Sequence, residues 1–234
     1  MEVAWVPVDG RGGPQLIPRP PGVRDGAPAP WASVALEERA IDTARVRAAF
    51  AAAGPGRPSP VEGTTARSAA VLAPLYDEDG STRVVLTRRA QHLRAHRGEV
   101  SFPGGGRDGD ESLVATALRE AQEEIGLDPS TVAIVGELDH LTTVTSSAYV
   151  VPFVGVIDDR PIGLRPQEAE VERILHVPLA ELLLDGVYHE ELWPLGQGVE
   201  RRLSFFDLED DTIWGATAGM LRQLLSVVLG VVGP

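Results

Sequence analysis

Runs of apolar residues, some unbroken and some alternating with polar residues, predict β-strands along much of the chain after residue 65. The predicted strands are 67–76, 82–89, 99–102, 131–138, 148–157 and 201–208. The sequence DEDG, from Asp77 to Gly80, separates the first two runs. Because aspartate and glycine accept the backbone angles of a tight turn, this spacing predicts a hairpin.

Apolar residues at helical spacing predict helices at 33–53, 111–125 and 212–229, and HVPLAELL predicts a turn into a short helix at 176–183. In the first helix, Leu36, Ala40, Ala44 and Ala48 are expected to share one face. Strands with a few helices between them favour an α+β fold. We expect an α/β/α sandwich, with a mixed β-sheet between helices.

Residues 1–65 differ from the rest of the chain because they hold many of its 19 prolines. Proline fixes φ and lacks a backbone donor, so these clusters predict extended or turning connections. We therefore expect two parts. Residues 1–65 form a proline-rich extension with one helix, and residues 66–234 form the domain that carries the chemistry.

Charge and composition narrow the function. The chain has 21 Lys and Arg against 34 Asp and Glu, a net charge of −13, which argues against nucleic acid as a partner because phosphate backbones attract clustered cations. It has no cysteine, which excludes disulfides, thiolate metal sites and cysteine nucleophiles. No apolar run reaches the ~18 residues of a membrane span, and the first residues lack a secretory signal. We expect a cytoplasmic protein without a membrane partner, whose apolar last helix suits a core or a homodimer interface.

The helix predicted at 111–125 has two opposite faces. Its apolar stripe consists of Val114, Leu118, Ala121 and Ile125. Glu120, Glu123 and Glu124 lie on the other face, where they repel one another at spacings of three and four residues. Only Arg119 is nearby to offset them, so we expect a further cation there, and hard divalent ions prefer oxygen ligands.

Glycines frame this acidic helix. The three glycines at 104–106 allow the backbone to approach a ligand closely. Asp108 or Asp110 is expected to cap the start of the helix, and Gly126 to end it.

The segment 101–129 resembles the Nudix box, G-x5-E-x7-R-E-U-x-E-E-x-G-U, in which U is aliphatic. The fixed positions are filled by Gly105, Glu111, Arg119, Glu120, Glu123, Glu124 and Gly126, with Leu127 at the last aliphatic position. The resemblance implies a Nudix fold and metal-dependent hydrolysis of a diphosphate. It implies that Mg²⁺ or Mn²⁺ binds Glu120, Glu123 and Glu124, with the Gly105 carbonyl as a further ligand. Glu111 and Arg119 are then a structural ion pair that fixes the loop to the helix.

The preceding segment, LTRRAQHLRAHRGEVSFPGG, resembles the extra motif of the coenzyme A pyrophosphatase branch of that superfamily, and 213–221 (IWGATAGML) is also similar to it. The residues that carry the resemblance are Leu86, Thr87, Arg88, Leu93, Arg94, His96, Gly98, Phe102 and Pro103. Glu99 departs from it, since glutamine is usual there. Arginines bind phosphate oxygens in bidentate pairs. We therefore expect Arg88, Arg89, Arg94, His96 and Arg97 to bind the phosphates of a coenzyme A-like substrate.

A second acidic cluster consists of Glu168, Glu170 and Glu172. The family resemblance implies that Glu170 completes the metal site or acts as the base, and an exposed charged loop is the alternative. The proton of the attacking water is expected to pass to Glu120 or Glu170. For coenzyme A the products would be 4′-phosphopantetheine and 3′,5′-ADP.

Two other functions stay open. One is hydrolysis of a different nucleoside diphosphate derivative, such as ADP-ribose or a dinucleotide. The other is a non-catalytic Nudix-fold regulator that only binds a ligand. The intact acidic cluster argues against the regulator, because a binding module has no need of three crowded carboxylates.

Overall fold

The computed structural model describes residues 10–59, 67–93, 96–143 and 148–231. The elements are β1 (Arg24–Asp25), η2 (Leu36–Arg39), α1 (Thr43–Ala53), β2 (Arg67–Glu78), β3 (Ser81–Arg89), β4 (Val100–Ser101), β5 (Gly104–Gly106), α2 (Leu113–Ile125), η3 (Pro129–Thr131), β6 (Val132–Glu137), β7 (Leu141–Thr142), β8 (Ala148–Ile157), β9 (Val171–Pro178), α3 (Leu179–Leu182), β10 (Tyr188–Gly196), β11 (Val199–Asp207), β12 (Thr212–Trp214) and α4 (Gly215–Leu229). They form two compact units. One is residues 41–179, and the other joins the chain before residue 41 to the chain after residue 179.

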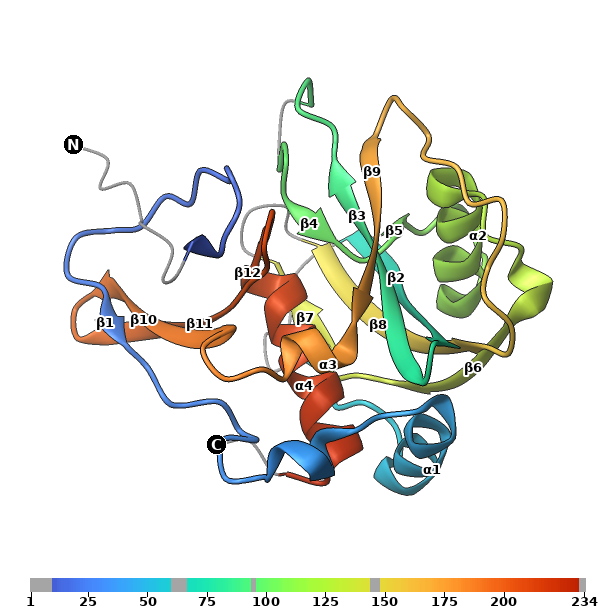
Figure 1. Cartoon of the computed structure of the whole chain (residues 1–234). Helices are drawn as coiled ribbons and strands as arrows, with labels where there is room; N and C mark the ends of the chain where they lie inside the picture. The colour runs from blue at the N-terminus through green and yellow to red at the C-terminus, as the bar shows by residue number, and fades with distance from the viewer. Residues whose placement is uncertain (1–9, 60–66, 94–95, 144–147, 232–234) are drawn as a thin grey trace. The chain divides into compact units, whose positions relative to one another are not determined.

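The unit of residues 41–179 is built on an eight-stranded mixed sheet (Figure 1). Its main path runs β4-β3-β2-β8-β6, while β5 pairs with β2, β7 with β8 and β9 with β3. The pairing of β2 with β8 is parallel and the other pairings are antiparallel. Asp79 and Gly80, both at positive φ, form the predicted hairpin turn between β2 and β3. The predicted mixed sheet is confirmed.

Helix α2 packs its apolar stripe onto one face of this sheet. Ala117, Ala121 and Ile125 are fully buried in a cluster with side chains of β2 and β8. Ser112 caps the helix, since its Oγ accepts a hydrogen bond from the Ala115 amide at 3.2 Å. The prediction that an aspartate at 108 or 110 would cap it was wrong. Because Ser112 is the cap, the helix begins at residue 113 and not at the predicted residue 111. Gly126 ends it as predicted, in the left-handed conformation.

Helix α1 lies against the opposite face of the same sheet. A Cβ on Gly136 would come within 2.5 Å of the Phe50 ring, so the glycine admits that ring. Gly136 pairs with Val154, which alternates with Phe153 of the α2 face. The sheet therefore lies between α1 and α2, as the predicted α/β/α sandwich requires.

The single helix predicted at 33–53 was wrong in extent and in its buried face. Only Thr43–Ala53 is α-helical, because Asp42 caps it by accepting a hydrogen bond from the Arg45 amide at 2.7 Å. The predicted stripe of Leu36, Ala40, Ala44 and Ala48 is exposed. Val46 and Phe50, four residues apart, make the buried face instead.

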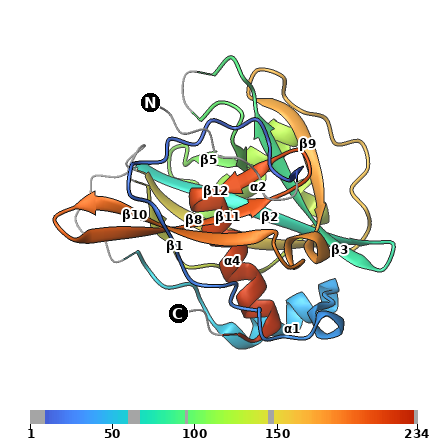
Figure 2. The same ribbon diagram turned by 60° about the vertical axis from the view of Figure 1, so that its left-hand side comes forward.

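The second unit contains the four-stranded sheet β1-β10-β11-β12 and helix α4. Figure 2 shows β10 and β11 as a long hairpin with β1 beside β10. The sequence analysis missed two long strands, β9 and β10, and the short strands β1, β5, β7 and β12. The predicted turn at 176–183 is the end of β9 followed by the four-residue α3. The predicted last helix begins at Gly215, after strand β12.

The proline-rich segment before residue 41 is part of this second unit. Trp31 is only 1% exposed, and its ring contacts those of Tyr188 and Phe206 at centroid distances of 5.3 and 6.2 Å. Arg39, also buried, donates to the Leu183 carbonyl and the Asp185 carboxylate. The proposed division between an extension up to residue 65 and a chemical domain after it stays a prediction. Among the described helices, none is both long and apolar enough to cross a membrane.

We expect Trp31→Ala to lower the free energy of unfolding by about 3–5 kcal/mol, because truncating a buried aromatic ring leaves a cavity. Urea unfolding followed by circular dichroism measures the change. Leu36→Ala is the control: its side chain is 58% exposed, and its effect should stay within about 0.5 kcal/mol. Equal effects of the two truncations would show that the Trp31 contacts do not stabilise the unit.

Candidate active site

The acidic face of α2 lies directly against the glycine strand β5. A Cβ on Gly105 would come within 2.5 Å of the carboxylate carbon of Glu120, so a larger residue there would push that carboxylate aside. The Gly104 amide donates a hydrogen bond to Glu124 Oε2 at 3.3 Å. Because β5 pairs with β2 in the middle of the sheet, the sheet fixes where these two carboxylates meet the glycine backbone.

Glu124 is the buried member of the acidic face, with 5% of its surface exposed. Burial disfavours its ionised form and raises the pKa of Glu124 from 4.5 to about 7. The positive charge of Arg89 and the Gly104 amide oppose this rise, whereas the charges of Glu120 and Glu170 add to it. Burial also raises the pKa of Glu120, and hydrogen bonding from Arg119 works against that rise.

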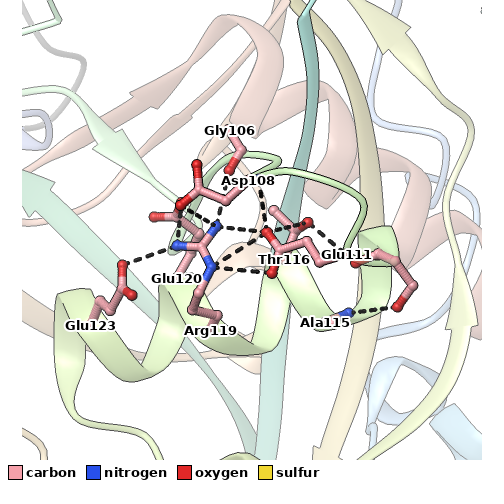
Figure 3. A network of polar contacts seen from close by, with 9 residues as sticks. Gly106, Asp108, Glu111, Ala115, Thr116, Arg119, Glu120 and Glu123 are labelled. Atoms are coloured by element: carbon pink, nitrogen blue, oxygen red, sulfur yellow. Dashed lines mark hydrogen bonds and ion pairs between the residues drawn. The ribbon is translucent and has the colours of Figure 1, made fainter.

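Arg119 is the centre of the polar network drawn in Figure 3. Its guanidinium contacts Glu111 at 2.8 Å, so the predicted ion pair between these residues is present. Glu111 also accepts from Thr116 Oγ1 and the Asp108 amide, each at 3.0 Å. These donors, Arg119 first among them, lower the pKa of Glu111 to about 2. The network ties the loop after β5 to the first turns of α2.

The same guanidinium reaches two of the predicted metal ligands. Its Nη1 lies 3.0 Å from Glu120 Oε1 and 3.0 Å from Glu123 Oε2, and its Nη2 donates to the Gly106 carbonyl at 3.0 Å. Glu123 is the outer member of the group, with its side chain 59% exposed. Arg119 therefore offsets the repulsion between the crowded carboxylates.

Glu170 approaches the acidic face from the loop between β8 and β9. Its charge raises the pKa of both Glu120 and Glu124. All three glutamates of the second acidic cluster are exposed, and Glu172 is paired with Arg88 at 3.2 Å. Glu170 is the member whose charge raises the pKa of both α2 carboxylates.

The predicted phosphate-binding residues lie at the end of β3 and in the loop to β4. Arg89 is close enough to Glu124 for its charge to act on that carboxyl group. His96 Nδ1 lies 2.9 Å from Glu99 Oε2, so the residue that departs from the coenzyme A motif is paired with a motif histidine. Arg97 is exposed, and Arg94 lies outside the described residues.

Comparison with known proteins identifies this arrangement. The family model of the NUDIX domain matches residues 66–195. The Nudix hydrolase NudL of Escherichia coli SMS-3-5 is 42% identical over 160 residues, which are 68% of this chain and 81% of that protein. NudL of Salmonella paratyphi B is 41% identical over the same shares. The chain belongs to the Nudix hydrolase family.

A solved Nudix domain is more distant in sequence. That of Shewanella oneidensis NrtR, complexed with ADP ribose, is 22% identical and has a TM-score of 0.41, covering 58% of this chain and 85% of that one. Family membership makes the protein a Nudix pyrophosphohydrolase that acts on nucleoside diphosphate derivatives. Nudix hydrolases generally use divalent metal ions.

The oxygen donors gathered at this site are of the chemical kind that binds such an ion. Glu120 and Glu124 converge on the glycine backbone of β5, where a Cβ would fill the space beside the carboxylate. Carboxylate and carbonyl oxygens are the donors that Mg²⁺ and Mn²⁺ prefer. Among the described residues, no three acidic or histidine side chains are yet close enough together to hold an ion. Arg119 is the cause we assign, since it holds Glu120 and Glu123 towards itself.

Sequence analysis missed several residues that support the site. Ser112 and Thr116 hold the start of α2 and the Glu111 carboxylate, and the serine just before the first apolar helical residue was the available signal. Gln167 organises the turn that carries Glu170. No sequence pattern marks Gln167 as part of the site, because the bond that joins it to the site runs from its amide to the Glu124 carbonyl of α2, more than forty residues earlier in the chain.

We expect the metal-free Nudix hydrolase to lose stability as pH rises through about 7. Glu124 binds a proton more tightly in the folded state, so its contribution is fully present below its unfolded pKa near 4.5 and is lost above its folded pKa. The loss over the whole interval between these two pKa values is on the order of 3 kcal/mol. Thermal melts in EDTA at pH 5.5 and 8 capture about 2 kcal/mol of it, since the fall begins near the unfolded pKa of 4.5.

Glu124→Gln should flatten this pH dependence and raise the melting temperature at pH 8. The exposed Glu123→Gln is the matched control and should leave the slope unchanged. A slope that persists in Glu124→Gln would mean that another group, such as Glu120, dominates the pH dependence.

Proposed function

We propose that this Nudix hydrolase cleaves the diphosphate of coenzyme A or its acyl derivatives and gives 4′-phosphopantetheine and 3′,5′-ADP. One observation carries the proposal: Arg89, from the segment that resembles the coenzyme A motif, lies close enough to Glu124 for their charges to interact. An arginine-bearing hairpin beside the carboxylate face suits a substrate with a diphosphate and a separate phosphate.

In this mechanism Glu120, Glu123 and Glu124 would hold Mg²⁺ or Mn²⁺, with the Gly105 carbonyl as a further ligand. Such an ion, when bound, would lower the pKa of a water and offset the charge of the diphosphate. Arg119 keeps the loop after β5 on α2 through Glu111 and the Gly106 carbonyl. Arg88, Arg89, Arg94, His96 and Arg97 bind phosphate oxygens and orient the substrate.

Glu170 is the better candidate for the base that takes the proton of the water. Glu120 Oε1 accepts a hydrogen bond from Arg119, so this oxygen is already occupied by a cation. Glu170 comes from a different element, and its charge acts on both α2 carboxylates. Its carboxylate would accept the proton of the attacking water.

We expect activity to require a divalent ion and Glu124→Gln to lower kcat roughly a hundredfold, because each ~1.4 kcal/mol of lost charge stabilisation is a factor of ten. Folding should be preserved, since the amide keeps the shape and removes repulsion. Metal titration after EDTA treatment and thermal melts are the measurements. Activity that survives EDTA, or an early-melting Glu124→Gln with normal kcat, would contradict the assigned metal ligands.

We expect kcat/KM for coenzyme A to exceed that for dephospho-coenzyme A by at least about tenfold, because one charge-assisted hydrogen bond to phosphate is worth about 1.5–3 kcal/mol. Steady-state kinetics with product identification by mass spectrometry gives both values, with ADP-ribose as the competing substrate. Equal values would show that no arginine reads the 3′-phosphate. A preference for ADP-ribose would move the chain to another substrate class within the family.

A further inference from the structure

The loop from β8 to β9 is anchored to the end of α2 that carries Glu124. The Arg165 amide donates to the Ile125 carbonyl at 2.9 Å, and the Gln167 amide donates to the Glu124 carbonyl at 2.8 Å. These carbonyls belong to the last turn of the helix, which lacks helical partners of its own. The loop is therefore attached to the backbone of α2 at Glu124.

Gln167 then shapes the turn that presents Glu170. The Glu170 amide donates to the Gln167 carbonyl at 2.9 Å and to Gln167 Oε1 at 3.1 Å. The Val171 amide donates to the same carbonyl at 2.8 Å. The backbone on either side of the Glu170 side chain is thus tied to one residue.

The hairpin after β3 holds this turn from its other side. The Ala90 amide donates to the Glu170 carbonyl at 2.9 Å, and His92 Nε2 lies 3.1 Å from the Ala169 carbonyl. A carbonyl only accepts, so Nε2 of His92 must carry the proton. His92 is therefore occupied by the loop, and this nitrogen is not available to a substrate phosphate.

We infer that His92 is a positioning residue for Glu170, which joins the phosphate-binding hairpin to the loop that carries the base. The inference rests on the proposed function only in that Glu170 is the base. Its consequence is that the end of β3, which carries Arg88 and Arg89, is joined by hydrogen bonds to the turn that carries Glu170. A substrate bound by the hairpin is then held at a fixed position relative to the Glu170 carboxylate, which takes the proton.

The test is a double-mutant cycle between His92 and Glu170 on coenzyme A with Mg²⁺. His92→Leu should lower kcat about tenfold with KM changed less than about twofold, because misplacing a catalytic group affects the chemical step. His92→Gln, which keeps an N–H donor, should recover to within about threefold of the unchanged enzyme. Combined with Glu170→Gln, His92→Leu should cause no further loss, since it acts through the missing carboxylate.

Glu168→Gln is the matched control, because it makes the same chemical change on an exposed position of the same loop and should leave kcat unchanged. Melting temperatures of all variants should agree within about 2 °C, as expected for surface positions. Fully additive losses in the double variant, or no loss in His92→Leu, would overturn the inference. So would a failure of His92→Gln to recover activity.

A second readout does not depend on turnover. In the metal-free protein, His92→Leu should speed hydrogen exchange of the Glu170 and Val171 amides at least about fivefold, because the turn loses one of its supports. Unchanged exchange would contradict the role of His92 in holding this turn. If the enzyme cleaves ADP-ribose rather than coenzyme A, the substrate proposal fails, and the same cycle on ADP-ribose still decides the role of His92.

Discussion

The site depends on one close approach, that of the β5 backbone to the carboxylates of α2. The helix must bury Ala117, Ala121 and Ile125 against the sheet, and this orientation turns Glu120 and Glu124 towards the glycine strand. A side chain at residue 105 would displace the Glu120 carboxylate from the glycine strand. The apolar packing of the core thus sets the position of the polar groups, and a shift of either element would separate them.

Crowding these carboxylates has an electrostatic cost that the chain meets in two ways. Arg119 contacts the carboxylates of Glu120 and Glu123, and it also pairs with Glu111, whose side chain it keeps ionised. Glu124 is too deeply buried for that solution, and its proton affinity rises instead. One helix face therefore carries carboxyl groups of different character, an ion-paired outer set and a buried group whose charge depends on its surroundings.

Sequence patterns predicted the acidic helix better than the strands around it. Spacing grouped Glu120, Glu123 and Glu124 on one face of α2 correctly, because helix periodicity is local, whereas no pattern marked the three glycines of β5 as a strand. Strand β10 was missed because Glu190 and Glu191 are buried in it, where they bind the Ala27 amide and the Arg19 side chain. Such partners lie far away in the chain and no local pattern reveals them. The sequence also does not distinguish the roles of Arg88 and Arg89. Arg88 is paired with Glu172, whereas the charge of Arg89 acts on Glu124, because the register of β3 against β9 shifts between these two arginines.

The pairing of β1 with β10 makes folding of the second unit a late event. Arg24 and Glu200, which are hydrogen-bonded, stand 176 positions apart, so closing that contact requires a loop that spans most of the chain. During synthesis the strands of residues 41–179 are complete before β10 exists, and that unit can fold first. Until β10 has been synthesised, the proline-rich first segment has no partner strand for β1. Its prolines suit this delay, since residues that lack an amide donor are poor templates for pairing with the wrong strand.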